Sequence, residues 1–201
     1  MVSRRHDRSS FDLTGFSTVR LLIAPLEQPA SGPILELAAG GPWTRNLVET
    51  VASVTPVDAS PEVARLNAER MTSSRVWYVR ADLFEWRLDT LYDFVFFGFW
   101  LSHVPEHRFA DFWRMHGQRS GPTVSPLHRQ LFGHEQTAPN HKEIGRDDIV
   151  ERKLDDGRTF NIVKVFYEPA VLEDRLRGLG WTGYVRSTGR FFIYGCVTPT
   201  S

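Results

Sequence analysis

PILELAAGGPWTRNL, residues 33–47, is the stretch that decides the fold. An apolar run with one acid, Glu36, is interrupted by Ala-Ala-Gly-Gly-Pro and is followed by a more polar segment. A short apolar run that ends at a glycine turn predicts a buried strand, and the residues after the turn have the apolar spacing of a helix. A glycine turn between a strand and a helix often makes room for a ligand. Two adjacent glycines are equally typical of a plain corner.

The chain then repeats this alternation of strand and helix. Strands are expected at residues 32–38, 53–60, 76–84 and 92–101, and helices at 16–28, 44–52 and 60–71. The third helix is well marked, because Ser60 is a suitable N-cap and Pro61 takes the first helical position. The fourth strand is nearly all apolar, as expected of a strand that is covered on both faces. This order predicts an α/β fold with a doubly wound, mostly parallel sheet in three layers, α/β/α.

The C-terminal third has a different pattern. Residues 151–169 predict a hairpin with Asp156-Gly157 in its turn, and residues 168–180 predict a helix that ends at glycine. Residues 182–197 predict two further strands, separated by Thr188-Gly189. We therefore expect an antiparallel strand pair at the C-terminal edge of the sheet.

Composition limits the classes of function. With 201 residues, 41% hydrophobic and 24% charged, the chain suits a single domain over 1–201, with an N-terminal arm at 1–15 and an atypical lid or loop segment at 115–150. Lys plus Arg (24) equals Asp plus Glu (24), which predicts no general attraction to nucleic acid or membrane. The only cysteine, Cys196, excludes an internal disulfide and a Cys-rich zinc site. No signal-peptide core or membrane-length apolar run is found, which predicts a cytoplasmic protein.

Unusual residues fall at the ends of the first four expected strands. They are Ala38–Gly41, Asp58, Asp82 and Gly98–Trp100. Parallel sheets bind ligands beyond the carboxyl ends of their strands, so these residues predict one shared site. Asp58 lies 22 residues after Glu36, the spacing at which nucleotide-binding folds place an acid that accepts hydrogen bonds from ribose hydroxyls. Asp58 could otherwise cap the next helix, but Ser60 already suits that role.

In order and spacing these motifs resemble the class I S-adenosylmethionine-dependent methyltransferases, which have a Rossmann-like fold. The resemblance covers roughly residues 32–113 and 151–197, through ILELAAGGPWT, VDAS, ADLFEW and YDFVFFGFWLSHVP. The last motif is similar to an actinobacterial-type branch that acts on small molecules. The resemblance implies an enzyme of class EC 2.1.1 that uses S-adenosylmethionine and releases S-adenosylhomocysteine.

The resemblance also implies which residues bind the cofactor. Asp58 would take the ribose, Asp82 the adenine amino group, and the next residue, Leu83, would lie against the ring. Phe99 and Trp100, after Gly98, are as well suited to line an adenosine or substrate pocket as to pack in the core. The full implied set is Glu36, Leu37, Ala38, Gly40, Gly41, Trp43, Thr44, Asp58, Ala59, Asp82, Leu83, Gly98, Phe99, Trp100 and His103.

His103 is the candidate catalytic base. Methylation of a hydroxyl needs a proton acceptor, and histidine suits neutral pH. The expected reaction is O-methylation of a small molecule, with a sugar or natural product as the guess from the branch. His103 could instead cap the next helix or bind the cofactor carboxylate, and His134 and His141 are weaker candidates. His103 and His107 lack an evident third ligand, so no metal site is predicted, although a metal requirement and a homodimer are left open.

Two departures from the family pattern keep other interpretations open. Gly40 and Gly41 are adjacent and Pro42 follows, so the glycine loop is one residue short of Gly-x-Gly. Residues 115–141 are polar, contain three prolines and predict a poor central strand, where the family has a very apolar one. An unusual lid or loop explains this stretch, and so does a slip of the coding frame that is restored near residue 141, which resequencing of the gene would test.

Three rival functions follow from the same residues. The main alternative is a catalytically impaired S-adenosylmethionine-binding protein of the same fold. An NAD-dependent oxidoreductase fits less well, because the loop is not Gly-x-Gly-x-x-Gly and Asp82 has no role in it. A nucleic-acid methyltransferase would need a basic domain and an Asn/Asp-Pro-Pro-aromatic motif on the fourth strand.

Overall fold

The computed structural model describes residues 32–40, 43–49, 51–86, 92–117, 127–131, 149–153, 156–187 and 192–200. The helix expected at 16–28, the loop residues Gly41 and Pro42, and the Thr188-Gly189 turn lie outside these ranges. The strands are β1 (Pro33–Leu37), β2 (Ser53–Asp58), β3 (Val79–Arg80), β4 (Phe94–Gly98), β5 (Leu127–Leu131), β6 (Ile149–Lys153), β7 (Thr159–Val163), β8 (Trp181–Ser187) and β9 (Phe192–Pro199). The helices are α2 (Trp43–Val48), α3 (Pro61–Arg70), α4 (Phe109–Gly117) and α5 (Pro169–Gly178), with 3₁₀ turns η1 (Leu101–His103) and η2 (Glu106–Arg108).

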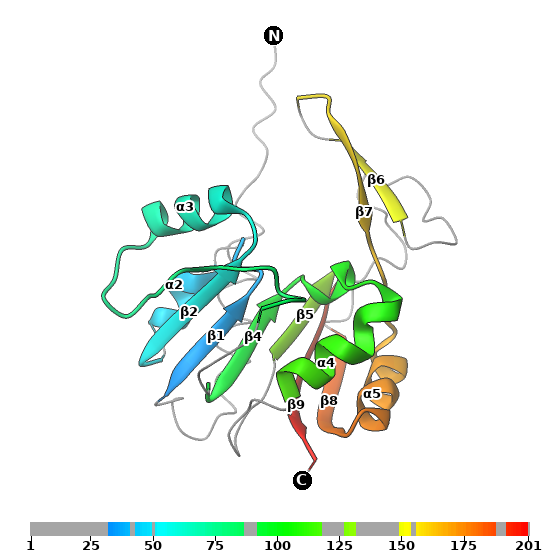
Figure 1. Ribbon diagram of the computed structural model, residues 1–201. Helices are drawn as coiled ribbons and strands as arrows, with labels where there is room; N and C mark the ends of the chain where they lie inside the picture. The colour runs from blue at the N-terminus through cyan, green and yellow to red at the C-terminus, as the bar shows by residue number, and fades with distance from the viewer. Residues whose placement is uncertain are drawn as a thin grey trace, which may run out of the picture.

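Seven strands form one sheet in the order β3-β2-β1-β4-β5-β9-β8 (Figure 1). The pairs from β3 to β5 are parallel, whereas β9 is antiparallel to both β5 and β8. The chain therefore has the expected doubly wound α/β fold, mostly parallel with an antiparallel C-terminal strand. Because the chain runs from β1 out to β3 and returns to β4 on the other side, the order reverses between β1 and β4. A ligand site is expected at this switch point.

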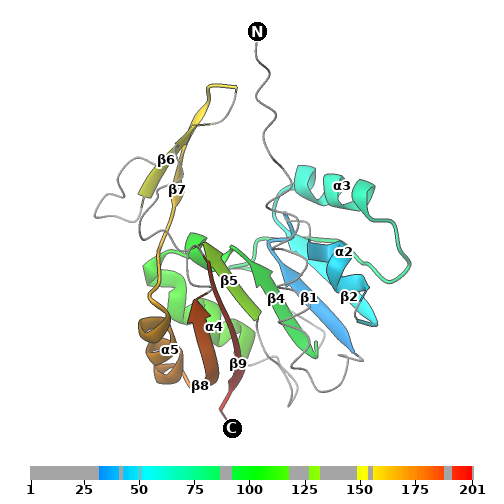
Figure 2. The same cartoon turned by 180° about the vertical axis from the view of Figure 1, so that it is seen from behind.

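The alternation of side chains along β1 and β4 divides the core between the two faces of the sheet. Ile34, Phe94 and Phe96 belong to a buried cluster with α2, whereas Leu35 and Phe97 belong to a cluster with α4 and α5. This is the period of two that a strand imposes. The helices accordingly lie in two layers, with α2 on one face and α4 on the other (Figures 1 and 2).

The helix α3 begins as the sequence predicts. Ser60 is its N-cap, with Oγ accepting a hydrogen bond from the backbone N–H of Val63 at 3.3 Å, and Pro61 occupies the first turn. In the described part of the chain, no helix is both long enough and apolar enough to span a membrane.

Two expectations differ from the structure. The strand expected at 76–84 is reduced to β3, two residues at the edge of the sheet, with a single bridge between Val54 and Val76. Residues 127–131, within the stretch expected to make a poor central strand, form β5 between β4 and β9. Backbone pairing on both sides of β5 overrides the low strand propensity of its polar sequence, because strand propensity depends strongly on context.

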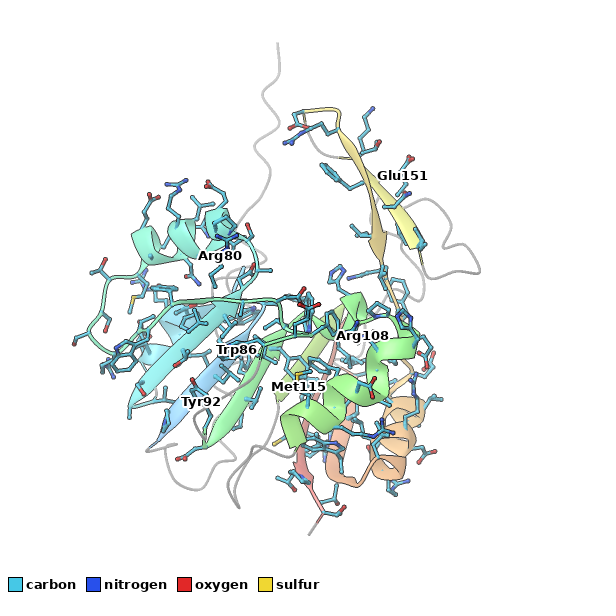
Figure 3. The ribbon with its side chains drawn as sticks, viewed as in Figure 1. Arg80, Trp86, Tyr92, Arg108, Met115 and Glu151 are labelled. Carbon is cyan, nitrogen blue, oxygen red and sulfur yellow. The ribbon has the colours of Figure 1, made fainter. Side chains whose placement is uncertain are left out.

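The predicted hairpin is formed by β6 and β7. These strands pair antiparallel from Ile149 opposite Val163 to Lys153 opposite Thr159, and Gly157 in the turn has a φ of 88°. The hairpin extends away from the seven-stranded sheet, as the position of Glu151 shows (Figure 3). Its base, at Val163, returns to the end of β4, where it becomes part of the candidate site.

Candidate functional site

Two left-handed turns lie side by side at the carboxyl ends of β1 and β4. Ala38 has a φ of 52° and Phe99 a φ of 63°, which only glycine adopts readily. Each such residue costs about 1–3 kcal/mol, and such strain clusters at ligand sites. We call residues 38–40 the β1 turn and residues 98–100 the β4 turn. Both stand at the switch point of the sheet, where a ligand is expected.

The β1 turn is connected to the two helices that follow it by a chain of buried hydrogen bonds. Thr44 Oγ1, on α2, donates to Glu36 Oε2 at 2.6 Å. Asn67 Nδ2, on α3, donates to Thr44 Oγ1 at 2.8 Å and to the Ala39 carbonyl at 2.8 Å. The sequence analysis missed Asn67. A polar residue on an otherwise solvent-facing helix gives no local signal that it is buried.

Glu36 is an ionisable group inside the core, 1% exposed. Burial raises the pKa of Glu36 to about 8; the hydrogen bond from Thr44 opposes this rise and the Asp58 carboxylate adds to it. Glu36 Oε1 is buried and has no hydrogen-bond partner among the described residues. A buried carboxyl oxygen beside a ligand site is suited to a cationic or hydrogen-bonding group of the ligand.

Asp58 lies next to the β1 turn, as predicted. Its Oδ1 accepts a hydrogen bond from the Ser60 N–H at 2.9 Å, and Oδ2 lies 4.0 Å from the point where a Cβ on Gly40 would stand. Partial burial raises the pKa of Asp58, while backbone hydrogen bonds from Ser60 and Ala59 oppose the rise. The acid and the glycine loop therefore share one corner of the site.

The segment after β3 contributes Phe84, which forms an aromatic wall of the site together with Trp100 of the β4 turn. Asp82 is exposed, and its Oδ1 accepts from the Phe84 N–H at 2.9 Å. The Phe84 ring lies 5.8 Å from that of Trp100, and the guanidinium of Arg108, labelled in Figure 3, lies 4.6 Å from the Phe84 ring centroid. The sequence analysis expected Leu83 to face the ligand. Leu83 is 5% exposed and packs in the core, so Phe84 is the aromatic residue that lies against the β4 turn.

Gly98 is required by close packing. A Cβ at this position would stand 2.5 Å from Trp43 Nε1 and 3.0 Å from Trp43 Cδ1. Trp43 is buried and lies 6.1 Å, centroid to centroid, from Phe99 and 5.9 Å from Phe96. Trp43, expected to bind a cofactor, therefore supports the β4 turn from within the core. Leu37 is likewise fully buried.

His103 follows the β4 turn in η1. Its Nδ1 lies 2.9 Å from the Val163 carbonyl oxygen, at the base of the hairpin. A carbonyl can only accept, so Nδ1 carries the proton and Nε2 carries the lone pair in the neutral ring. The His103 ring lies 6.4 Å from that of Trp100, so the histidine extends the row formed by Phe84 and Trp100.

Two buried polar residues lie beneath His103, and neither was identified from the sequence. Ser102 Oγ donates to the Phe99 carbonyl at 3.0 Å and accepts from Lys164 Nζ at 2.8 Å. The Val165 N–H donates to the Ser102 carbonyl at 2.8 Å. Residues 163–165 at the base of the hairpin thus contact η1. Because Ser102 of η1 also donates to the Phe99 carbonyl, these contacts help to fix the β4 turn.

The residues predicted at the strand ends therefore lie along four neighbouring strands, β3, β2, β1 and β4. The β1 turn and Asp58 form one side, Phe99, Trp100 and His103 the other, and Asp82 stands beyond β2 at the edge. Gly41, His134 and His141 lie outside the described residues, and Ala59 is exposed. Among the residues that the structure describes, no three His, Cys, Asp or Glu side chains form a group that could hold a metal ion.

These residues fit S-adenosylmethionine. Besides Glu36 Oε1, the Trp100 Nε1 is buried without a hydrogen-bond partner within the described ranges, so an acceptor and a donor stand at adjacent strand ends. A carboxylate beside a glycine turn and an aromatic row suit the ribose, amino-acid and adenine parts of a nucleoside ligand.

Comparison with protein-family models and with curated proteins finds no match. Solved structures do match. The DhpI–SAH complex is 34% identical, with a TM-score of 0.74, over 96% of this chain and 92% of DhpI. The DhpI–SAM–HEP complex is also 34% identical, with a TM-score of 0.75, over 95% of this chain and 92% of DhpI. The glycopeptide N-methyltransferase MtfA with S-adenosylmethionine shares the fold at 17% identity, with a TM-score of 0.67 over 92% of this chain and 94% of MtfA.

The identity to DhpI extends over nearly the whole of both chains, and the two DhpI complexes contain SAH and SAM. This chain belongs to the class I S-adenosylmethionine-dependent methyltransferases and is an enzyme of class EC 2.1.1.

Proposed function

We propose that S-adenosylmethionine binds across the β1 and β4 turns and that its methyl group is transferred to a hydroxyl of a small molecule. When bound, the cofactor supplies an electrophilic methyl on a sulfonium centre. Glu36 and the β1 turn would hold its amino-acid part, Asp58 the ribose hydroxyls, and the Phe84–Trp100 pair the adenine, with Asp82 at the adenine amino group.

The proposal of O-methylation rests on the hydrogen bond between His103 and the Val163 carbonyl. It fixes the tautomer that leaves the Nε2 lone pair as proton acceptor, and it orients the ring beside Trp100. Removal of the hydroxyl proton by a positioned base contributes typically 10²–10⁴ in rate. Because displacement at a methyl group requires the attacking oxygen in line, a fixed base that also orients the acceptor contributes to proximity as well.

The acceptor class follows from what surrounds His103. With Phe84 and Trp100 assigned to the adenine, His103 at the end of this row is the group that would face the acceptor, and the balanced charge of the chain gives no general attraction to a polyanion such as nucleic acid. The DhpI complex that contains SAM together with HEP also supports a small-molecule acceptor. A hydroxyl of a sugar or natural product is the substrate that we propose.

Isothermal titration with S-adenosylhomocysteine tests the cofactor site. The wild-type protein should bind, and Asp58→Ala should weaken binding at least about tenfold, since hydrogen bonds to a charged acceptor contribute about 1.5–3 kcal/mol. Asp93→Ala removes an exposed acid from the opposite end of the sheet and serves as the matched control. Well-folded protein that does not bind, or equal affinities for both variants, would contradict the proposal.

Assays of methyl transfer to a panel of hydroxylated acceptors separate this function from its main rival. The rival is a protein that binds the cofactor without turnover, and the short Gly-Gly-Pro loop is the observation that favours it. Methylated product, identified by mass and by the position of the methyl on oxygen, supports the enzyme. Tight cofactor binding without product on any acceptor would support the rival.

A further inference from the structure

Asn67 is an unusual residue for its helix. It is the one buried residue of α3, 7% exposed, whereas the remaining residues of this helix are exposed or half-buried. Burying an amide is unfavourable unless its donors and acceptors find partners. The partners of Asn67 therefore indicate why this position is polar.

The Asn67 amide donates one hydrogen bond to the β1 turn and one to α2. The Ala39 carbonyl can only accept, so Nδ2, and not Oδ1, must face it. The second hydrogen goes to Thr44 Oγ1, which leaves the Thr44 proton for Glu36. Asn67 thus sets the direction of the two bonds that connect α3 through Thr44 to the buried acid.

The peptide groups of Ala39 are fixed on both sides. Its N–H donates to the Val57 carbonyl of β2 at 3.1 Å, and its carbonyl accepts from Asn67. The residue before it, Ala38, is left-handed, and the Gly40 N–H donates back to the Ala38 carbonyl at 2.7 Å. Without the amide of Asn67, the Ala39 carbonyl loses the side-chain bond that links this strained turn to α3.

We propose that Asn67 is a positioning residue that holds the β1 turn, residues 38–40, in the conformation that binds S-adenosylmethionine. This inference rests on the cofactor position given under the proposed function. Asn67 acts through the Ala39 carbonyl and through Thr44 and Glu36, and it needs no contact with the cofactor itself. It links the β1 turn to α3, the helix that follows β2, through the Ala39 carbonyl.

Tyr78 provides a control that separates this role from general support of α3. Its hydroxyl donates to the backbone carbonyls of Asn67 and Met71, each at 3.1 Å. Tyr78→Phe therefore loosens the same turn of the helix and leaves the Asn67 amide in place. Asn67→Leu removes the amide at similar size, and Asn67→Asp replaces its two donated hydrogens with an acceptor.

The test is titration of the apoprotein with S-adenosylhomocysteine, together with kinetics at varied S-adenosylmethionine. We expect Asn67→Leu and Asn67→Asp to bind about tenfold more weakly, with a matching rise in KM and with kcat at saturation within about threefold of wild type. Tyr78→Phe should bind within about twofold of wild type.

Each other outcome overturns the inference. Folded Asn67 variants that bind like wild type would show that the amide does not position the loop. If Tyr78→Phe loses as much affinity for S-adenosylhomocysteine as the Asn67 variants, the affinity depends on α3 as a whole and not on the Asn67 amide. If the Asn67 variants do not fold, Asn67 stabilises the fold and does not specifically position the turn. If wild type binds and Asp58→Ala does not, while the Asn67 variants bind normally, only this inference fails. If wild type itself does not bind, the proposed function fails and this inference with it.

Discussion

The β1 turn and the β4 turn are strained alike but are stabilised by different parts of the chain. The β1 turn is fixed by bonds that join residues 8, 23 and 28 positions apart, all within the first strands and helices of the fold. The η1 turn, which follows the β4 turn directly, makes contacts 60 and 62 positions along the chain, to the base of the β6–β7 hairpin. The first turn can therefore form with its own βαβ unit, whereas the site around His103 is complete only when the hairpin has returned to the sheet.

This difference separates the two tasks of the enzyme. The local half carries the acid and the glycine loop proposed to bind the cofactor, and the long-range half carries the proposed base. The two halves also differ in charge, since Glu36 accepts from the neutral Thr44 hydroxyl and Asp58 from a backbone N–H, whereas a buried lysine, Lys164, donates to Ser102, the residue before His103.

The largest expected effect is on the long-range half. His103→Gln should lower kcat by about 10²–10⁴ while leaving S-adenosylhomocysteine affinity within a few fold, because the base is lost and the cofactor half is unchanged. The exposed His107, in η2, gives the matched control His107→Gln, which should keep full activity. Steady-state kinetics and titration measure both. A near-normal kcat in His103→Gln would contradict the assignment of the base to the long-range half of the site.

On the local half, Glu36→Gln should change how stability depends on pH. Because burial raises the pKa of Glu36 from 4.5 to about 8, the folded state keeps a proton that the unfolded state has lost between these values. The free energy of unfolding should therefore fall as pH rises from about 5 to about 8, by about 1.4 kcal/mol per pH unit from this group. Glu36→Gln should lack this slope.

Urea denaturation of wild type and Glu36→Gln across this pH range checks the expectation. Below about pH 4 Glu36 is protonated in both the folded and the unfolded state, so the difference between the proteins should be constant there. A difference that stays constant from there through pH 8 would show that folding does not raise the pKa of Glu36, and the local half would then contain two charged acids at neutral pH, Glu36 and Asp58.

Gly98→Ala tests the contact that joins the two halves. A methyl group at this position meets the Trp43 ring of α2, and overpacking of this kind costs about 1–3 kcal/mol. Gly178→Ala, at the end of α5 where a Cβ meets nothing within 4 Å, is the control and should be neutral or slightly stabilising. Chemical denaturation compares them. Equal stability of both variants would mean that Trp43 moves freely and that the β4 turn does not depend on α2.

The smallest effect is expected for Thr44. Thr44→Val should lose about 1 kcal/mol, because Glu36 Oε2 and one hydrogen of Asn67 lose their partner, while Thr44→Ser keeps the hydroxyl and should lose less. Since the Thr44 bond lowers the pKa of Glu36, Thr44→Val should also move the pH-dependent fall in stability to higher pH. If Thr44→Ser is more destabilising than Thr44→Val, the methyl group and not the hydroxyl is the part of Thr44 that stabilises the site.

Much of the cofactor half could be predicted, because its signals are local. A strand, a glycine turn and an acid at the next strand end occur in order along the chain, and parallel pairing brings them to one edge. Asn67 could not be found in this way. Its role depends on which face of α3 is covered, and the pattern of that helix is polar nearly all round.

The aromatic wall shows a second limit. The sequence placed a strand at 76–84 and expected Leu83 to face the ligand, but β3 is only two residues long and the chain turns at Asp82. That turn buries Leu83 and brings Phe84 to Trp100. Because residues 82–86 form a turn, the alternation of a strand does not decide which of these side chains is buried.

The sequence by itself determined the α/β order, the switch point between β1 and β4, and the family to which the chain is similar, because hydrophobic period and turn residues act locally. Only the tertiary structure decided that polar residues 127–131 form a central strand and that residues 163–165 stabilise η1 and His103. Those features depend on backbone and side-chain partners from distant parts of the chain, and such partners exist only once the sheet has assembled.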